Sequence, residues 1–146
     1  MLLKKIKEEL ISSMKQSNKE SVLAIRNILE KIKTEEVNTK KEIDEDGIIK
    51  IISKYVKQLK DSISQFKAGG RDDLVEKEAN ELKMVEKFLP KQLSYLEIEK
   101  IVIDSINSIG ASNISDMGRV IKNVMEQAKG TADGKTISEI TKKLLV

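Results

Sequence analysis

The sequence predicts an all-α protein, with an N-terminal four-helix region of long helices followed by a small C-terminal three-helix domain. Apolar side chains recur at the helical spacing of three and four residues almost throughout the chain. Helix-forming residues dominate and the 146 residues include one proline, which favours long helices over sheets. With 39% hydrophobic and 35% charged residues, the composition is typical of a folded chain rather than a disordered one.

Four helices are expected in residues 1–90, each with an apolar stripe that faces inward. The stripes are Leu3, Ile6, Leu10 and Met14; Val22, Ile25, Leu29 and Ile32; Ile48, Ile52, Tyr55, Leu59, Ile63 and Phe66; and Val75, Leu82, Val85 and Leu89. The third helix would be about 36 Å long at about 1.5 Å per residue.

Polar residues and glycines predict where these four helices begin and end. Ser17 with Glu20 has the spacing of a capping box that begins the second helix, and the polar segment 38–42 predicts the next turn. The acids 44–46 suit the first turn of the third helix, and Gly69-Gly70 suits its end. Asp72 and Asp73 then begin the fourth helix, which is expected to continue to Pro90.

Three shorter helices are expected in residues 91–146, after a boundary at Pro90. Ser94 with Glu97 is a second capping box, Gly110 ends the first helix, and Asn113 with Asp116 predicts the N-cap of the next. Lys129-Gly130 ends the middle helix, and Asp133 caps the last. The inward residues are Ile98, Ile101, Val102, Ile106 and Ile109; Met117, Val120, Ile121, Val124 and Met125; and Ile137, Ile140 and Leu144.

The composition excludes several kinds of site. The chain has no cysteine and no histidine, so disulfides, thiolate nucleophiles and the commonest transition-metal ligand are missing. No cofactor and no metal ion are expected. The N-terminal segment is too charged for a signal peptide and no apolar run is long enough to span a membrane, so a cytoplasmic location without membrane contact is expected.

No residue pattern predicts catalysis. The paired acids Asp44/Glu45/Asp46 and Asp72/Asp73 could hold Mg²⁺, but first-turn positions favour an interpretation as helix caps, and Glu35/Glu36 reads as a solvated face. Serines lack an activating histidine, and no phosphate-binding glycine loop is present. Whether the chain is an enzyme stays open.

Basic residues gather near the C-terminus. From Met117 to Val146 there are six Lys or Arg against three acids, whereas residues 94–116 have one against four. One face of the middle helix presents Arg119, Lys122, Glu126 and Lys129, and the last helix presents Lys135, Glu139, Lys142 and Lys143. Such faces suit nucleic-acid phosphates. The alternative is an ordinary charged surface with Lys122–Glu126 and Lys135–Glu139 pairs.

Two glycine positions bear on this choice. Gly118 lies inside the predicted middle helix, where glycine costs about 1 kcal/mol relative to alanine. A small residue there permits close approach, either by another helix or by a nucleic-acid backbone. The segment 130–134 predicts a tight turn, in which Gly130 follows one helix and Asp133 begins the next.

Several segments of the chain together form a recognisable pattern. They are Asp116-Met117-Gly118-Arg119-Val120-Ile121, Gly130-Thr131-Ala132-Asp133-Gly134, the closing Leu144, Phe88-Leu89-Pro90-Lys91-Gln92-Leu93, Gly70-Arg71-Asp72-Asp73-Leu74 and Ile25-Arg26. In these segments the chain resembles the YqeY family and the related tail domain of the GatB subunit of tRNA-dependent amidotransferases. The resemblance runs from near Leu2 to the end, so the chain is expected to be a complete stand-alone YqeY-type protein.

The resemblance implies an all-α fold and a tRNA-contacting role for the C-terminal domain. The resemblance assigns this role to Gly118, Arg119, Lys122, Lys129, Gly130 and Lys135. Lys142 and Lys143 join the RNA-binding hypothesis because they lie on the basic face of the last helix. Thr131 and Glu126-Gln127 stand where the family is more basic, which would weaken phosphate binding. Ile121 replaces a common methionine, which should affect packing only.

Three functions are therefore carried forward. The first is a non-catalytic tRNA-binding accessory protein, for which no DNA partner is expected. The second is a component associated with carbon–nitrogen ligase activity with glutamine as amido donor, acting through an amidotransferase or aminoacyl-tRNA synthetase; the ligase activity is implied by the resemblance alone. The third is a helical protein-interaction module.

Overall fold

The structure, a computed structural model, describes residues 1–146 and confirms the all-α fold. Seven α-helices and one 3₁₀ turn follow one another without a strand. The residues form two compact units, Met1–Leu89 and Pro90–Val146. No helix has both the length and the apolar character needed to cross a membrane.

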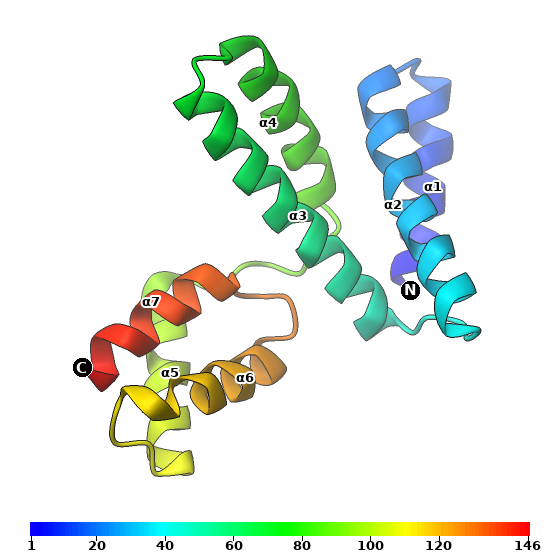
Figure 1. Ribbon diagram of the computed structural model, residues 1–146. Coiled ribbons are helices and arrows are strands. Elements are labelled where there is room, and N and C mark those ends of the chain that lie inside the picture. Colours follow the sequence, from blue (N-terminus) through cyan, green and yellow to red (C-terminus); the bar gives the residue numbers. More distant parts are fainter. The chain divides into compact units, whose positions relative to one another are not determined.

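The first unit contains four helices that form two hairpins. They are α1 (Leu2–Lys15), α2 (Lys19–Thr39), α3 (Glu45–Ala68) and α4 (Asp72–Glu86) (Figure 1). Each helix contributes one side chain with no exposed surface, namely Ile6, Ile28, Ile52 and Val85. Burying such a side chain stabilises the folded state by about 1.5–3 kcal/mol, so these four positions join the two hairpins in one core.

The turn between α1 and α2 corrects the predicted capping box. Ser17 has φ 56° and ends α1 in a left-handed conformation, with the Asn18 N–H donating back to Ser13 O at 3.0 Å. Asn18 is the N-cap of α2, and its side chain accepts a hydrogen bond from Ser21 N at 3.2 Å. The prediction at Ser17 was wrong because that residue completes the preceding helix and cannot also adopt the extended N-cap conformation.

The ends of α3 and α4 lie where the sequence predicted them, except for the C-terminal end of α4. Asp44 caps α3 by accepting from Gly47 N at 2.8 Å, and Gly70, with φ 70°, follows its last turn. The helix α4 ends at Glu86 rather than next to Pro90. Phe88 N bonds Val85 O and Leu89 N bonds Glu86 O, so the chain tightens into 3₁₀-type bonds before the proline.

The second unit contains α5 (Tyr95–Ile109), the 3₁₀ turn η1 (Ile114–Asp116), α6 (Met117–Ala128) and α7 (Gly134–Leu145). The capping box of Ser94 with Glu97 is confirmed, as is the left-handed Gly110 after α5. The core has fully buried residues from all three helices, including Val102, Val124 and Ile137.

Two expected inward residues of this unit are exposed. Leu144 is 40% exposed, and Leu145 is buried in its place, because the buried stripe of α7 shifts to Thr141 and Leu145 in the last turn. Met125 is 44% exposed, so the stripe of α6 is narrower than predicted and centres on Val120 and Val124.

Candidate nucleic-acid interface

The start of α6 is organised by Asp116. One carboxylate oxygen of Asp116 accepts from Ser112 N at 3.1 Å, and the other accepts from Arg119 Nη2 at 2.7 Å. The Ser112 N–H and then the Arg119 guanidinium hold the pKa of the Asp116 carboxyl below its usual range. Asp116 therefore ties the preceding loop to Arg119 and orients the guanidinium, while 63% of the Arg119 side chain stays exposed.

Gly118 is exposed, and no atom lies within 4 Å of the position that a Cβ would occupy. Close packing of another helix of the same unit is thus not the reason for a glycine here. Its φ lies outside the left-handed region, so the backbone does not need glycine either. The glycine leaves a bare stretch of helix surface between Met117 and Arg119.

The remaining cations of α6 and its end are exposed too. Lys122 projects to solvent one turn after Arg119, and Lys129 is the left-handed C-cap of α6, with φ 45°. The Lys122–Glu126 and Lys135–Glu139 pairs of the ordinary-surface interpretation do not form. These ammonium groups are consequently not neutralised by direct contact with a neighbouring carboxylate.

The turn between α6 and α7 is anchored to the segment that leads into α5. Gly130 has φ 80°, and its carbonyl accepts from Gln92 Nε2 at 2.9 Å. Leu93 N donates to Thr131 O at 2.8 Å. These two bonds hold the turn that carries Lys129 and Gly130 and that positions the first residues of α7.

The cations fall into two groups along the packed helices α6 and α7. The two helices run in opposite directions, so the end of α7 lies toward the start of α6 (Figure 1). Arg119 and Lys122 therefore lie in the half of α6 that is nearer to the last turn of α7, which carries Lys142 and Lys143. Lys129, Gly130 and Lys135 form the other group at the connecting turn. All six cations are exposed.

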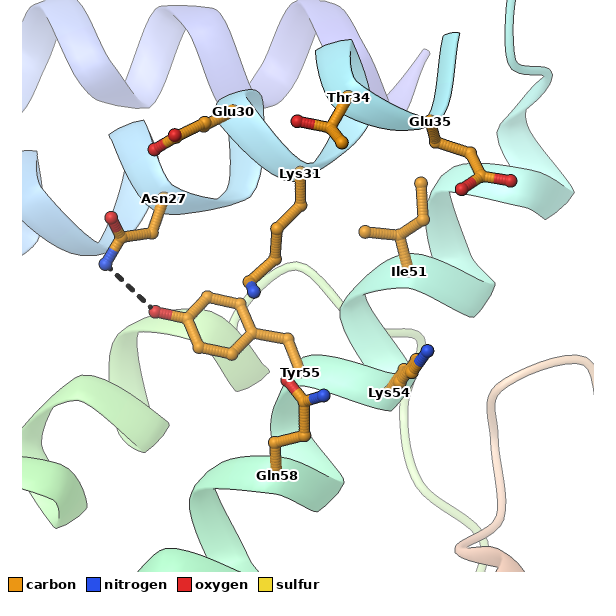
Figure 2. A pocket seen from close by; sticks show the side chains of 9 residues that line it. All are labelled: Asn27, Glu30, Lys31, Thr34, Glu35, Ile51, Lys54, Tyr55 and Gln58. Carbon is orange, nitrogen blue, oxygen red and sulfur yellow. Dashed lines mark hydrogen bonds between the residues drawn. The ribbon is translucent and has the colours of Figure 1, made fainter. Parts of the chain in front are cut away.

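The first unit contains a polar network that sequence reasoning did not find. The Tyr55 hydroxyl of α3 donates to Glu81 of α4. Asn27 Nδ2 of α2 donates to the Tyr55 hydroxyl at 3.2 Å, as Figure 2 shows. Burial and then the Glu81 hydrogen bond raise the pKa of Tyr55 above its usual range. The three residues are far apart in sequence, so no local spacing signals the network.

A groove of about 580 Å³ lies beside this network, between α2 and α3 (Figure 2). Its lining includes Lys31 and Lys54 and the amides of Asn27 and Gln58. Lys31 Nζ lies 4.8 Å from the centre of the Tyr55 ring, a cation–π contact between two residues that line the groove.

No cluster of three or more acidic side chains is placed to hold a metal ion. Two of the acids considered as Mg²⁺ ligands have other contacts at helix starts. Asp44 caps α3, and Asp73 in the first turn of α4 forms an ion pair with Arg71 at 3.2 Å.

These observations define an all-helical protein of two compact units whose C-terminal three-helix unit exposes two groups of cations. The chain belongs to the family of Yqey-like proteins, whose family model matches residues 3–145. The predicted resemblance to the YqeY family is thus confirmed.

Two relatives illustrate the similarity. An uncharacterized protein of Schizosaccharomyces pombe is 28% identical over 89 residues, which cover 61% of this chain and 72% of that protein. The Kluyveromyces lactis protein named "Altered inheritance of mitochondria protein 41, mitochondrial" is 34% identical over 90 residues. That match covers 60% of this chain and 44% of the yeast protein's length.

Proposed function

We propose that this protein is a non-catalytic tRNA-binding accessory protein that contacts the RNA backbone through the exposed cations of α6 and α7. The observation that carries the proposal is the bare helix surface at Gly118 beside Arg119 and Lys122. A helix would be more stable with alanine at this position, and nothing in the fold uses the space that the glycine leaves. An approaching phosphate backbone would use both the space and the two charges.

Charge complementarity supports the same role for the four remaining cations. Lys129, Lys135, Lys142 and Lys143 are exposed and add positive charge around α7. Lysine binds phosphate as a flexible point charge and arginine binds it as a planar fork. The surface therefore suits a phosphate backbone, and binding of this kind needs no base-specific contacts.

Charge reversal at Arg119 and Lys122 tests the proposal. Full-length wild type and the variant Arg119→Glu/Lys122→Glu would be titrated against labelled unfractionated tRNA in gel-shift experiments. A matched control is Lys91→Glu/Lys100→Glu, which reverses two exposed lysines elsewhere in the same unit. We expect the first variant to lose binding and the control to keep it. Equal binding by wild type and both variants would remove this surface from consideration.

A second candidate function is an accessory role in glutamine-dependent amidation through a protein partner, such as an amidotransferase or an aminoacyl-tRNA synthetase. The observation that favours a protein partner is the exposure of large apolar side chains on the first hairpin: Ile11 is 55%, Met14 51% and Leu23 55% exposed. Met14 was expected to face inward, and that prediction was wrong, because it lies in the last turn of α1, beyond the buried Ile6. Co-purification of the tagged protein with an identified tRNA-handling enzyme, lost in Ile11→Asp/Met14→Asp, would support this role.

Recovery of no such enzyme would count against the second candidate. An activity of the chain by itself is tested separately, by glutamine-dependent amidation of misacylated tRNA with purified protein alone; we expect no product. The cytoplasm remains our proposed location, and the word "mitochondrial" belongs to the name of the Kluyveromyces lactis relative.

A further inference from the structure

We propose that the N-terminal unit carries a second RNA-backbone-binding surface on α3, formed by Lys50, Lys54 and Lys57. This set is termed the lysine stripe below. The three residues are spaced by four and three positions, so they share one face of the helix. The opposite face of α3 is buried and includes Ile52. The inference rests on the RNA-binding function proposed above and assigns a second contact surface for the same ligand.

The lysine stripe is exposed and has no ion pair. Lys60, one turn farther along α3, lies 4.0 Å from Glu86 of α4, which shows that α3 lysines can reach acids of the adjacent helix. Lys50, Lys54 and Lys57 reach none within 4.0 Å. Like charges three and four residues apart cost helix stability, and a bound anion would remove that cost.

The groove between α2 and α3 brings one further lysine close to the stripe. Lys54 of the stripe and Lys31 of α2 both line it, and Gln58 adds an amide donor (Figure 2). Two carboxylates, Glu30 and Glu35, also line the groove. Figure 2 shows them on α2, to either side of the Lys31 side chain, so the α3 wall of the groove is the cationic one.

Acids also flank the stripe along α3. Asp46 precedes Lys50 by four residues and Asp61 follows Lys57 by four, and neither is within ion-pair distance of these lysines. The uncompensated segment is therefore limited to about two turns, roughly 10 Å at about 1.5 Å per residue. A short row of point charges of this length suits a few consecutive phosphates of one strand.

The absence of exposed apolar side chains on α3 favours RNA over a lipid surface. Large exposed hydrophobic residues occur on α1 and α2, for example Ile11 and Leu23, but none is on α3. A peripheral membrane helix combines basic residues with an apolar face that enters the bilayer. The lysine stripe offers charge alone, which is what phosphate-backbone recognition requires.

The test compares full-length variants in their binding of labelled unfractionated tRNA as a function of salt. The stripe variant is Lys50→Ala/Lys54→Ala/Lys57→Ala. Its matched control, Lys41→Ala/Lys77→Ala/Lys83→Ala, removes three exposed lysines elsewhere in the same unit. We expect the stripe variant to bind about tenfold more weakly than wild type and its logarithmic salt slope to fall by about two to three, since each lost phosphate contact removes about 0.7–0.9. The control should match wild type.

The outcomes separate this inference from the proposed function. A stripe variant that binds like its control overturns the second surface, whatever Arg119→Glu/Lys122→Glu does. Loss of binding in the stripe variant while Arg119→Glu/Lys122→Glu binds normally supports the stripe and contradicts the C-terminal site. Stripe-dependent sedimentation with phosphatidylglycerol vesicles, with tRNA binding unchanged, would assign the stripe to a lipid surface and overturn the RNA inference.

Discussion

Gly118 and Gly130 are both glycines at the ends of α6, but only Gly130 has a backbone conformation that requires one. Gly130 has φ 80°, a region where an added Cβ is strained, and its carbonyl is held by Gln92. Gly118 is helical and has free space around it. The fold therefore requires glycine at position 130, whereas nothing in the fold explains the glycine at position 118.

Substitution by alanine should have opposite effects at these two positions. Gly118→Ala is expected to raise the free energy of unfolding by up to about 1 kcal/mol, because alanine is the better helix former. Gly130→Ala should lower it by about 1–2 kcal/mol, because a left-handed conformation is costly with a side chain. Urea unfolding followed by circular dichroism measures both. A destabilised Gly118→Ala would mean that the fold does use this glycine.

A larger side chain at Gly118 should affect binding rather than folding. Gly118→Leu keeps every cation but fills the space beside Arg119. We expect several-fold weaker tRNA binding at unchanged salt slope, since no phosphate contact is lost. Fluorescence anisotropy with Gly118→Ala as the smaller control checks this. Unchanged affinity in Gly118→Leu would show that the RNA backbone does not approach this surface closely.

Tyr55 should make the stability of the protein depend on alkaline pH. Burial and Glu81 raise the pKa of Tyr55, so the folded state holds this proton more tightly than the unfolded state, in which the pKa is about 10. The contribution is complete below pH about 10 and is lost as the pH rises above that value. Tyr55→Phe has no such proton, so its unfolding free energy should fall less steeply above pH 10 in parallel urea titrations. Equal slopes would contradict the raised pKa.

At the scale of the elements, the start of a helix was predictable where its N-cap residue takes no part in ending the preceding helix. Asp44, Ser94 and Asp133 each cap the helix that the sequence predicted, because their side chains act on backbone groups two or three residues away. The Ser17 prediction failed because the short α1–α2 turn must both end α1 and begin α2. Residue spacing alone does not show which of its residues adopts the left-handed conformation.

Substitution by alanine can distinguish Asn18 from Ser17 as the N-cap of α2. Asn18→Ala should lower the free energy of unfolding by about 1 kcal/mol, because Ser21 N loses its acceptor. Ser17→Ala should change it much less, since no hydrogen bond of the α2 cap involves the Ser17 side chain. Thermal or urea unfolding of both variants decides between them. The reverse order would restore Ser17 as the cap.

Only the local features of the candidate site could be predicted from the sequence. Sequence spacing correctly places Arg119 and Lys122 one turn apart, and the structure shows both of them exposed. The Asp116 contact to Arg119 has a visible three-residue spacing that could have been noticed. The Tyr55–Glu81–Asn27 network and the groove could not, because they depend on how α2, α3 and α4 pack.

At the scale of the whole molecule, the positions of the charged residues indicate more about an anionic partner than the net charge does. The chain carries a net charge of +3, and its acids and bases are nearly balanced. Arg119 is paired with Asp116, but exposed lysines without carboxylate partners occur on α6 and α7 and again on α3. An account in which both units contact one polyanion explains why these positions stay unpaired in a protein that forms ion pairs elsewhere, such as Lys87 with Glu9 at 3.5 Å.

The salt dependence of tRNA binding by full-length wild type, compared with Arg119→Glu/Lys122→Glu, tests the central claim most directly. Anisotropy titrations from low to physiological salt give the logarithmic slope of the association constant. The account predicts a slope that is smaller by about two in the variant, together with weaker binding at every salt concentration, because two phosphate contacts are lost. A variant with the slope and affinity of wild type, or a wild type that binds no tRNA at low salt, would contradict it.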